Sequence, residues 1–357
     1  MTRHRIDVHA HYLGGTVERL FASGFTLAGG YRIPAGWSPE GALAFIDRHE
    51  IAAQILSAPW PFAGTGDDPG FATRFCRDVN HEYAELIAKY PGRFGAFAAV
   101  PLDSPDTMLA EIAYGLDDLG LDGVMLTSNS VGHYFGQPFY EPVLAELDRR
   151  EVPVFLHPTD CPHVDVLGFG RPSSVCEYPF DTARNIVNAL YTGVFQRYPR
   201  LRLILAHCGG ALPSLGWRIA EHTTMGRGPE DAAIDPGHVA DVLRRLYYDT
   251  ALAGSAHSLL PTLQVTDATH VLFGTDWPAA PEATVERNIR NHGVPGLHRP
   301  TADRSRAHQR DTPLPPLHLT GTRQYTTGRH RPAPSQDTPQ QKGTSRCASA
   351  TATGVTS

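Results

Sequence analysis

The sequence predicts a (β/α)₈ TIM barrel in which a disordered C-terminal tail replaces the last helix. Short apolar segments alternate with helix-like segments, a pattern typical of a parallel sheet covered by helices. Eight such apolar segments precede residue 291, and eight strands close a barrel. The apolar periodicity then stops. We therefore expect a barrel domain over residues 1–290 and a tail over residues 291–357, although an open doubly wound sheet produces a similar linear pattern.

The predicted strands are short runs rich in Val, Ile, Leu and Phe. Each lies between helix-like or turn-forming segments, as buried parallel strands do. In chain order they are Ile6–Ala10, Ala52–Ser57, Phe94–Val100, Gly123–Thr127, Val152–Leu156, Leu203–Ala206, Leu246–Thr250 and His270–Gly274.

The predicted helices carry start and stop signals. Ser38 precedes Pro39 and Glu40, which together form an N-cap, a first-turn proline and an acidic first turn. Pro91 and Gly92 end a second helical stretch. The helices expected after the first are Asp78–Tyr90, Thr107–Leu119, Pro142–Arg149 and Asp181–Tyr198.

Composition excludes several classes of function. The net charge is -6 without a long basic run, which argues against nucleic acid or an anionic membrane as the partner. No segment approaches the roughly 18 apolar residues of a membrane span. The first strand follows Met1 closely, so we expect no signal peptide. The five cysteines are scattered and odd in number, which predicts a reduced, cytoplasmic setting.

Potential metal ligands gather at the ends of four predicted strands. The first strand ends in His9-Ala10-His11, and alternate residues of a strand share a face. His157, His207 and Asp276 follow the fifth, sixth and eighth strands. Imidazole and carboxylate ligands suit a first-row divalent ion with an open position for water or substrate. Because the active face of such a barrel lies at these strand ends, we expect a metal site there.

Each ligand also has an ordinary structural interpretation. A His-X-His pair arises often by chance, and a single histidine such as His157 is often a packed or capping residue. His207 is open to a core hydrogen bond, and Asp276 to an N-cap of the next helix. All of them fall at the same end of the predicted barrel, which favours a shared site over independent coincidences.

Four motifs resemble those of the amidohydrolase-related decarboxylases, the aminocarboxymuconate-semialdehyde decarboxylase-like family. They are Ile6-Asp7-Val8-His9-Ala10-His11, Leu156-His157-Pro158, Leu205-Ala206-His207-Cys208-Gly209-Gly210 and Phe273-Gly274-Thr275-Asp276-Trp277-Pro278. Three further segments are similar to the 6-methylsalicylate decarboxylase branch: Trp37-Ser38-Pro39-Glu40, Tyr178-Pro179-Phe180-Asp181-Thr182 and Tyr247-Tyr248-Asp249-Thr250-Ala251. The resemblance covers about Arg5 to Asn288.

The resemblance implies His9, His11, His157 and Asp276 as ligands of one zinc or manganese ion, with His207 beside the substrate. It places Arg32 in a loop that binds a substrate carboxylate, although a solvated loop arginine is an equal alternative. Binuclear relatives bridge two metals with a carbamylated lysine. The two lysines of this chain are Lys89, in a predicted helix, and Lys342, in the tail, so one ion is expected.

The family resemblance implies non-oxidative decarboxylation of a small aromatic acid, such as a salicylate, in secondary metabolism. Asp276 or a water on the ion would supply the proton, helped by His207. Trp60, Phe273 and Trp277 are candidate aromatic walls, with core packing as the alternative. A metal-dependent hydrolase of a lactone, ester or amide uses the same ligands, and a non-catalytic remnant is a third interpretation. The family also implies a homodimer or larger homo-oligomer.

The tail departs from the family pattern. Members end with a last helix and an Asn-Ala-Arg-Leu-Phe-like segment, which this chain lacks. A frameshift near Asn291 is one explanation, because a shifted reading of the following codons permits an ordinary helical sequence. The nucleotide sequence of the gene tests this hypothesis. All candidate ligands precede the change.

Overall fold

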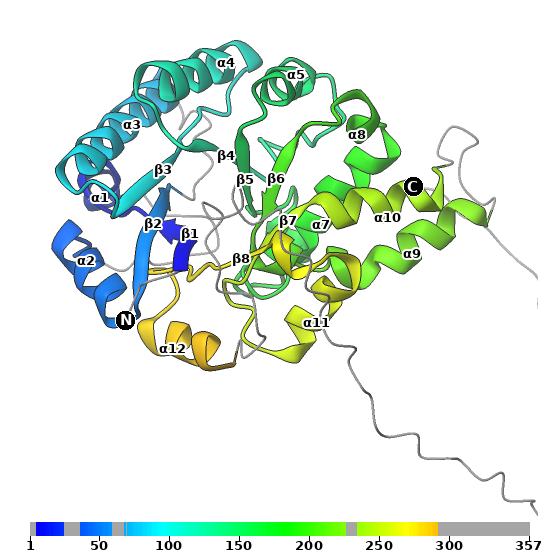
Figure 1. The fold of residues 1–357 in the computed structure, drawn as a ribbon. Coiled ribbons are helices and arrows are strands. Elements are labelled where there is room, and N and C mark those ends of the chain that lie inside the picture. The colour runs from blue at the N-terminus through cyan, green and yellow to red at the C-terminus, as the bar shows by residue number, and fades with distance from the viewer. Residues whose placement is uncertain (1–4, 25–35, 59–67, 69, 226–233, 292–357) are drawn as a thin grey trace, which may run out of the picture. The chain divides into compact units, whose positions relative to one another are not determined.

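The computed structural model describes residues 5–24, 36–58, 68, 70–225 and 234–291, all within a compact unit that spans residues 1–308. Eight parallel strands form its centre, and helices surround them (Figure 1). The strands are β1 (Arg5–His11), β2 (Ile51–Ser57), β3 (Phe94–Ala98), β4 (Gly123–Thr127), β5 (Pro153–His157), β6 (Arg202–Leu205), β7 (Tyr247–Asp249) and β8 (Val271–Leu272). Each predicted strand is present, within a few residues of its expected bounds.

The strands follow one another around a closed barrel. Neighbours pair in chain order from β1 to β8, all in parallel. Between β1 and the segment around β8, Val8 N donates to Phe273 O at 2.9 Å and His11 N donates to Trp277 O at 2.8 Å. These hydrogen bonds close the barrel, so the TIM-barrel prediction is confirmed and the open-sheet alternative is wrong.

Apart from α12, which follows β8, the helices lie between consecutive strands. The longer ones are α1 (Gly15–Ala22), α2 (Pro39–Arg48), α3 (Phe71–Lys89), α4 (Pro105–Ala113), α5 (Glu141–Arg150), α7 (Glu177–Tyr191), α9 (Leu212–Thr224), α10 (Pro236–Arg245), α11 (Ala256–Val265) and α12 (Glu282–Asn291). Short turns are α6 (Val164–Leu167), α8 (Val194–Arg197), η3 (His207–Gly209) and η5 (Ala268–His270), and a π-helix, η2 (Tyr114–Asp118), follows α4. The predicted cap is confirmed, because Ser38 Oγ accepts from Gly41 N at 3.1 Å.

Two predicted helices are each divided. The stretch Thr107–Leu119 is α4 followed by η2, and Asp181–Tyr198 contains the end of α7 and then α8. Gly193 separates the latter two with a φ of 72°, a left-handed conformation that ends a helix. Apolar periodicity continues across such a break, so periodicity alone does not find it.

A helix, α12, follows the last strand, whereas the sequence analysis expected a disordered tail from residue 291 in place of the last helix. Val285 and Asn288 of α12 are buried, and Val285 packs with Phe45 and Ile46 of α2. Packing of this buried face against α2 stabilises α12 despite its many charged residues. The predicted tail from residue 292 onward lies outside the described residues, so the boundary between barrel and tail stays a prediction.

The barrel has an inner and an outer apolar layer. The inner cluster consists of Val8, Phe97, Met125, Phe155, Ile204, Ala206 and Leu272. Val154 and Leu156, which alternate with Phe155 along β5, instead pack outward with residues of α5 and α7. His157 lies two residues beyond Phe155 and therefore also faces inward. Within the described part of the chain, no helix is both long and apolar enough to cross a membrane.

Candidate metal centre

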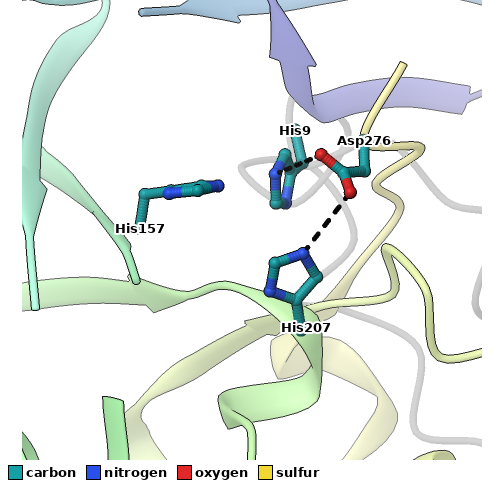
Figure 2. A group of neighbouring side chains, drawn as sticks. All are labelled: His9, His157, His207 and Asp276. Carbon is teal, nitrogen blue, oxygen red and sulfur yellow. Dashed lines mark ion pairs between the residues drawn. The ribbon is translucent and has the colours of Figure 1, made fainter. Parts of the chain in front are cut away.

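The structure brings the predicted ligands together at the carboxyl ends of the strands. Ligand atoms of His9, His157, His207 and Asp276 all lie within 4.8 Å of one another (Figure 2). His11 joins this group because its Nε2 lies 2.7 Å from Asp276 Oδ1. The cluster therefore contains every predicted ligand and also His207, which the family resemblance placed beside the substrate.

Asp276 lies between the histidines. Its Oδ1 is 3.3 Å from His9 Nε2, and its Oδ2 is 3.7 Å from His207 Nε2. The His11 and His157 ring centroids are 5.2 Å apart. The side chain of Asp276 thus contacts the histidines, and α12 begins only at Glu282, so the N-cap alternative for Asp276 is wrong.

Two residues of the cluster have left-handed backbone conformations. His207 has a φ of 55° and Asp276 a φ of 63°, values that are uncommon for residues other than glycine and carry strain. Gly210 completes the turn after β6, where a Cβ atom would lie 2.4 Å from Pro179 O. The chain therefore needs glycine here to turn His207 toward the other histidines.

Asp249, at the end of β7, is a buried residue of the site that the sequence analysis quoted only as part of a motif. Its Oδ2 accepts a hydrogen bond from His9 Nδ1 at 2.7 Å. Its Oδ1 accepts from the backbone N of His207 at 3.0 Å and of Ala251 at 2.9 Å. Asp249 thereby fixes the ring of His9 with Nε2 toward Asp276, and it also anchors the turn that carries His207.

Asp7 is a second acidic residue that sequence reasoning missed. It is fully buried and accepts hydrogen bonds from His9 N, Gln54 Nε2 and Thr275 Oγ1 at 3.2, 3.0 and 2.6 Å. Burial raises the pKa of Asp7 to about 6, although these hydrogen bonds oppose the shift. A sequence signal existed, since Asp7 precedes His9 by two residues in the same strand.

The carboxylates create a site that attracts positive charge. Burial lowers the pKa of His9, but Asp249 and Asp276 more than offset this and raise it to about 10. Burial would raise the pKa of Asp276, yet His11, His207 and His9 hold it well below its usual value. Burial lowers the pKa of His11 and, more strongly, that of His157, which favours the neutral ring with a lone pair for a ligand role.

The donor set fits a divalent metal ion. His9 Nε2 and His207 Nε2 are buried without a hydrogen-bond partner, which is costly unless another group satisfies them. His157 Nδ1 donates to Pro158 O at 2.7 Å, leaving Nε2 for a ligand role. Imidazole nitrogens with one carboxylate are ligands that zinc and other first-row ions prefer. The structure supports a metal-binding site, and the identity of the ion stays a proposal.

A cavity of about 500 Å³ opens on the cluster. His11, His157, His207 and Asp276 contribute to its lining. The remaining lining comes from the segments before α7, α9 and α12, from the first turns of α7, α9, α11 and α12, and from the loop after β7. A small molecule in this cavity would therefore contact the cluster directly.

The residues predicted to contact the substrate, unlike the predicted ligands, are not found together at the site in the described part of the chain. Arg32 and Trp60 lie outside the described residues. Phe273 is buried in the cluster that contains Phe45, and Trp277 stacks on Phe45 with ring centroids 4.6 Å apart. Neither Phe273 nor Trp277 is among the described residues that line the cavity, which favours the core-packing alternative for both.

The sequence model of the amidohydrolase family matches residues 6–303. Decarboxylase yanB of Aspergillus niger is 32% identical over 301 residues, covering 80% of this chain and 80% of the relative. The 6-methylsalicylic acid decarboxylase acuB of Aspergillus aculeatus is 31% identical, covering 80% and 88%. The crystal structure of a 2,6-dihydroxybenzoate decarboxylase complexed with 2,6-dihydroxybenzoate superposes with a TM-score of 0.69 at 25% identity, covering 85% and 99%.

Proposed function

This chain belongs to the amidohydrolase family and is a carboxy-lyase, and from that premise we propose that it decarboxylates a salicylate such as 6-methylsalicylate. The observation that carries the proposal is the group of His9, His157, His207 and Asp276 beside a cavity. The kinship to a 6-methylsalicylic acid decarboxylase supports the choice of substrate.

The main obstacle in this reaction is charge. Direct loss of CO₂ from a benzoate would leave an aryl carbanion of very high energy. Protonation of the ring carbon that bears the carboxylate removes this obstacle, because the carbon–carbon bond then breaks with its electron pair returning to the ring. An ortho-hydroxyl stabilises the cationic ring in between. The reaction converts 6-methylsalicylate and one proton into 3-methylphenol and CO₂.

We propose that His9, His11, His157 and Asp276 hold one zinc or manganese ion. An ion held by these residues would supply positive charge that helps to bind and orient an anionic aromatic substrate. Asp249 keeps the His9 ring in place through the hydrogen bond to Nδ1. The buried surroundings of His9 and Asp276 exclude bulk water, which strengthens their interaction with charge.

His207 and Asp276 are the proposed proton-transfer pair. His207 Nε2 and Asp276 Oδ2 are 3.7 Å apart, longer than a hydrogen bond, as is common for such groups before the substrate binds. Both residues line the cavity, so both are placed to contact an acid bound there. A positioned proton donor contributes about 10²–10⁴ in rate.

The proposal is tested by incubating the purified, metal-loaded chain with 6-methylsalicylate in D₂O. We expect CO₂ and 3-methylphenol, with deuterium at the carbon that carried the carboxylate. Lactone, ester and amide substrates serve as the comparison for the hydrolase alternative. Hydrolysis of one of these without any decarboxylation of salicylates would contradict the proposal, and no turnover of either class by a folded, metal-loaded chain would favour a non-catalytic protein.

A further inference from the structure

Leu252 is the only large aliphatic residue among the described residues that line the cavity. The other apolar residues there are alanine, glycine, proline and Tyr178. We propose that Leu252 selects the substituent at the second ortho position of the substrate ring, favouring an alkyl group over a hydroxyl. This inference rests on the proposed function and specifies the substrate class of the same site.

The backbone holds Leu252 in an unusual, exposed position. Its φ is 53°, in the left-handed region that a leucine rarely adopts, and 45% of the residue is exposed. The flanking residues Ala251 and Ala253 are buried. Ala251 N donates to Asp249 Oδ1 at 2.9 Å, and Ala253 N donates to Thr250 O at 3.2 Å. Hydrogen bonds thus anchor the loop on both sides of Leu252, which lines the cavity. A strained backbone conformation such as that of Leu252 is commonly kept at functional sites.

The strand order places Leu252 beside the proton-transfer pair. It follows β7, whose neighbours in the barrel are β6 and β8. His207 follows β6 and Asp276 follows β8, so Leu252 lies between them around the cavity mouth. An ortho substituent is next to the ring carbon that receives the proton. A ring whose carboxylate-bearing carbon lay between His207 and Asp276 would therefore place one of its two ortho substituents on the Leu252 side of the cavity.

Leu252 presents only carbon and hydrogen to the substrate. A methyl group against this side chain loses contact with water favourably, whereas a hydroxyl there loses water without gaining a hydrogen bond. Polar side chains also line the cavity: Ser174, Tyr178, Ser214, His257, Ser258 and Thr284. They belong to the segments around α7, α9, α11 and α12, whereas the lining residue of the loop after β7 is Leu252. The wall at Leu252 therefore favours 6-methylsalicylate over 2,6-dihydroxybenzoate.

The test replaces Leu252 by asparagine and compares two substrates. Asparagine is similar in size, tolerates a left-handed backbone and offers hydrogen bonds. For wild type we expect a higher kcat/KM with 6-methylsalicylate than with 2,6-dihydroxybenzoate. In Leu252→Asn we expect this ratio to fall by about tenfold or more, within the range of apolar pocket discrimination. A thermal unfolding midpoint no lower than that of wild type would show that the change is local.

Leu260→Asn is the matched control. Leu260 lies on α11, is 53% exposed and is not among the described residues that line the cavity, so its substitution should leave the ratio unchanged. Three results would overturn the inference without affecting the proposed decarboxylase function. They are an unchanged kcat/KM ratio in Leu252→Asn, an equal change of this ratio in both variants, and a wild-type preference for 2,6-dihydroxybenzoate. Failure of wild type to decarboxylate either acid would overturn the proposed function and the inference with it.

Discussion

Histidines and carboxylates gather at two places in the described part of the chain. One is the buried group of His9, His157, His207 and Asp276 at the strand ends, and the other is His49, Glu282 and Glu286 between α2 and α12. In both places the ligand atoms lie within 4.8 Å of one another. Proximity alone thus does not distinguish a metal site from a surface ion-pair network.

The two groups differ in how their polar atoms are satisfied. In the surface group, Glu282 already accepts from Arg48 Nε at 2.9 Å, from Arg48 Nη2 at 3.0 Å and from His49 Nε2 at 2.8 Å. The positive charge of Arg48 therefore already compensates the negative charge of Glu282. In the buried group, His9 Nε2 and His207 Nε2 have no hydrogen-bond partner. Buried polar atoms without a hydrogen-bond partner, rather than the number of histidines and carboxylates, therefore indicate a metal site.

The largest expected effect separates the roles inside the buried group. His157→Ala should lose the ion and all activity, because it removes an inward-facing ligand that no neighbour replaces. His207→Ala should keep the ion and lose about 10²–10⁴ in decarboxylation rate, since it removes a proton-transfer partner only. Elemental analysis of the purified variants and release of CO₂ from 6-methylsalicylate measure the two effects.

His49→Ala is the control from the surface group and should retain both the ion and the activity. Equal loss of the ion in His157→Ala and His207→Ala would place His207 in the ligand set in contradiction to the predicted roles. Loss of the ion in His49→Ala would remove the distinction between the two groups.

The sequence predicted most of the barrel because each strand combines an apolar run with flanking turn signals. Gly123–Thr127 has the observed bounds, and β8 is the least well predicted, with two strand residues where five were expected. The histidines were found because strand ends in a barrel share one face. Apolar periodicity is a local property and strand order a topological one, and both can be predicted from the sequence.

Other features depend on contacts that a sequence does not display. The role of Asp249 follows from a hydrogen bond to His9, which lies 240 residues away. Phe273 and Trp277 were candidate aromatic walls, but Phe273 is buried in the apolar cluster that contains Phe45, and Trp277 stacks on Phe45. The cytoplasmic location, the oligomeric state and the frameshift near Asn291 stay predictions, because no contact in the described residues bears on them.

A smaller effect is expected when a residue behind the ligands is changed. Asp249→Asn removes the negative charge of the carboxylate that accepts hydrogen bonds from His9 Nδ1 and from two backbone N–H groups. We expect the fold to persist and the metal affinity to fall about 10–100-fold, as for other residues that orient a ligand. Competition with a chelator measures the affinity. Asp241→Asn, at an exposed position of α10 that pairs with Arg244, is the matched control and should have no effect. Unchanged affinity in Asp249→Asn would mean that His9 does not need this carboxylate.

The smallest effect is expected at the surface group. Glu282→Gln removes the charge that Arg48 and His49 contact, but the side chains of Glu282 and Arg48 are 36% and 54% exposed. Exposed pairs contribute little, so the free energy of unfolding should fall by less than about 1 kcal/mol, with metal content unchanged. Urea denaturation measures the stability, and Glu286→Gln, whose partner Arg290 is 3.9 Å away, is the control with a still smaller effect. A loss of bound metal in Glu282→Gln would show that a carboxylate already satisfied by arginine can still hold an ion, and the contrast between the two groups would then fail at its premise.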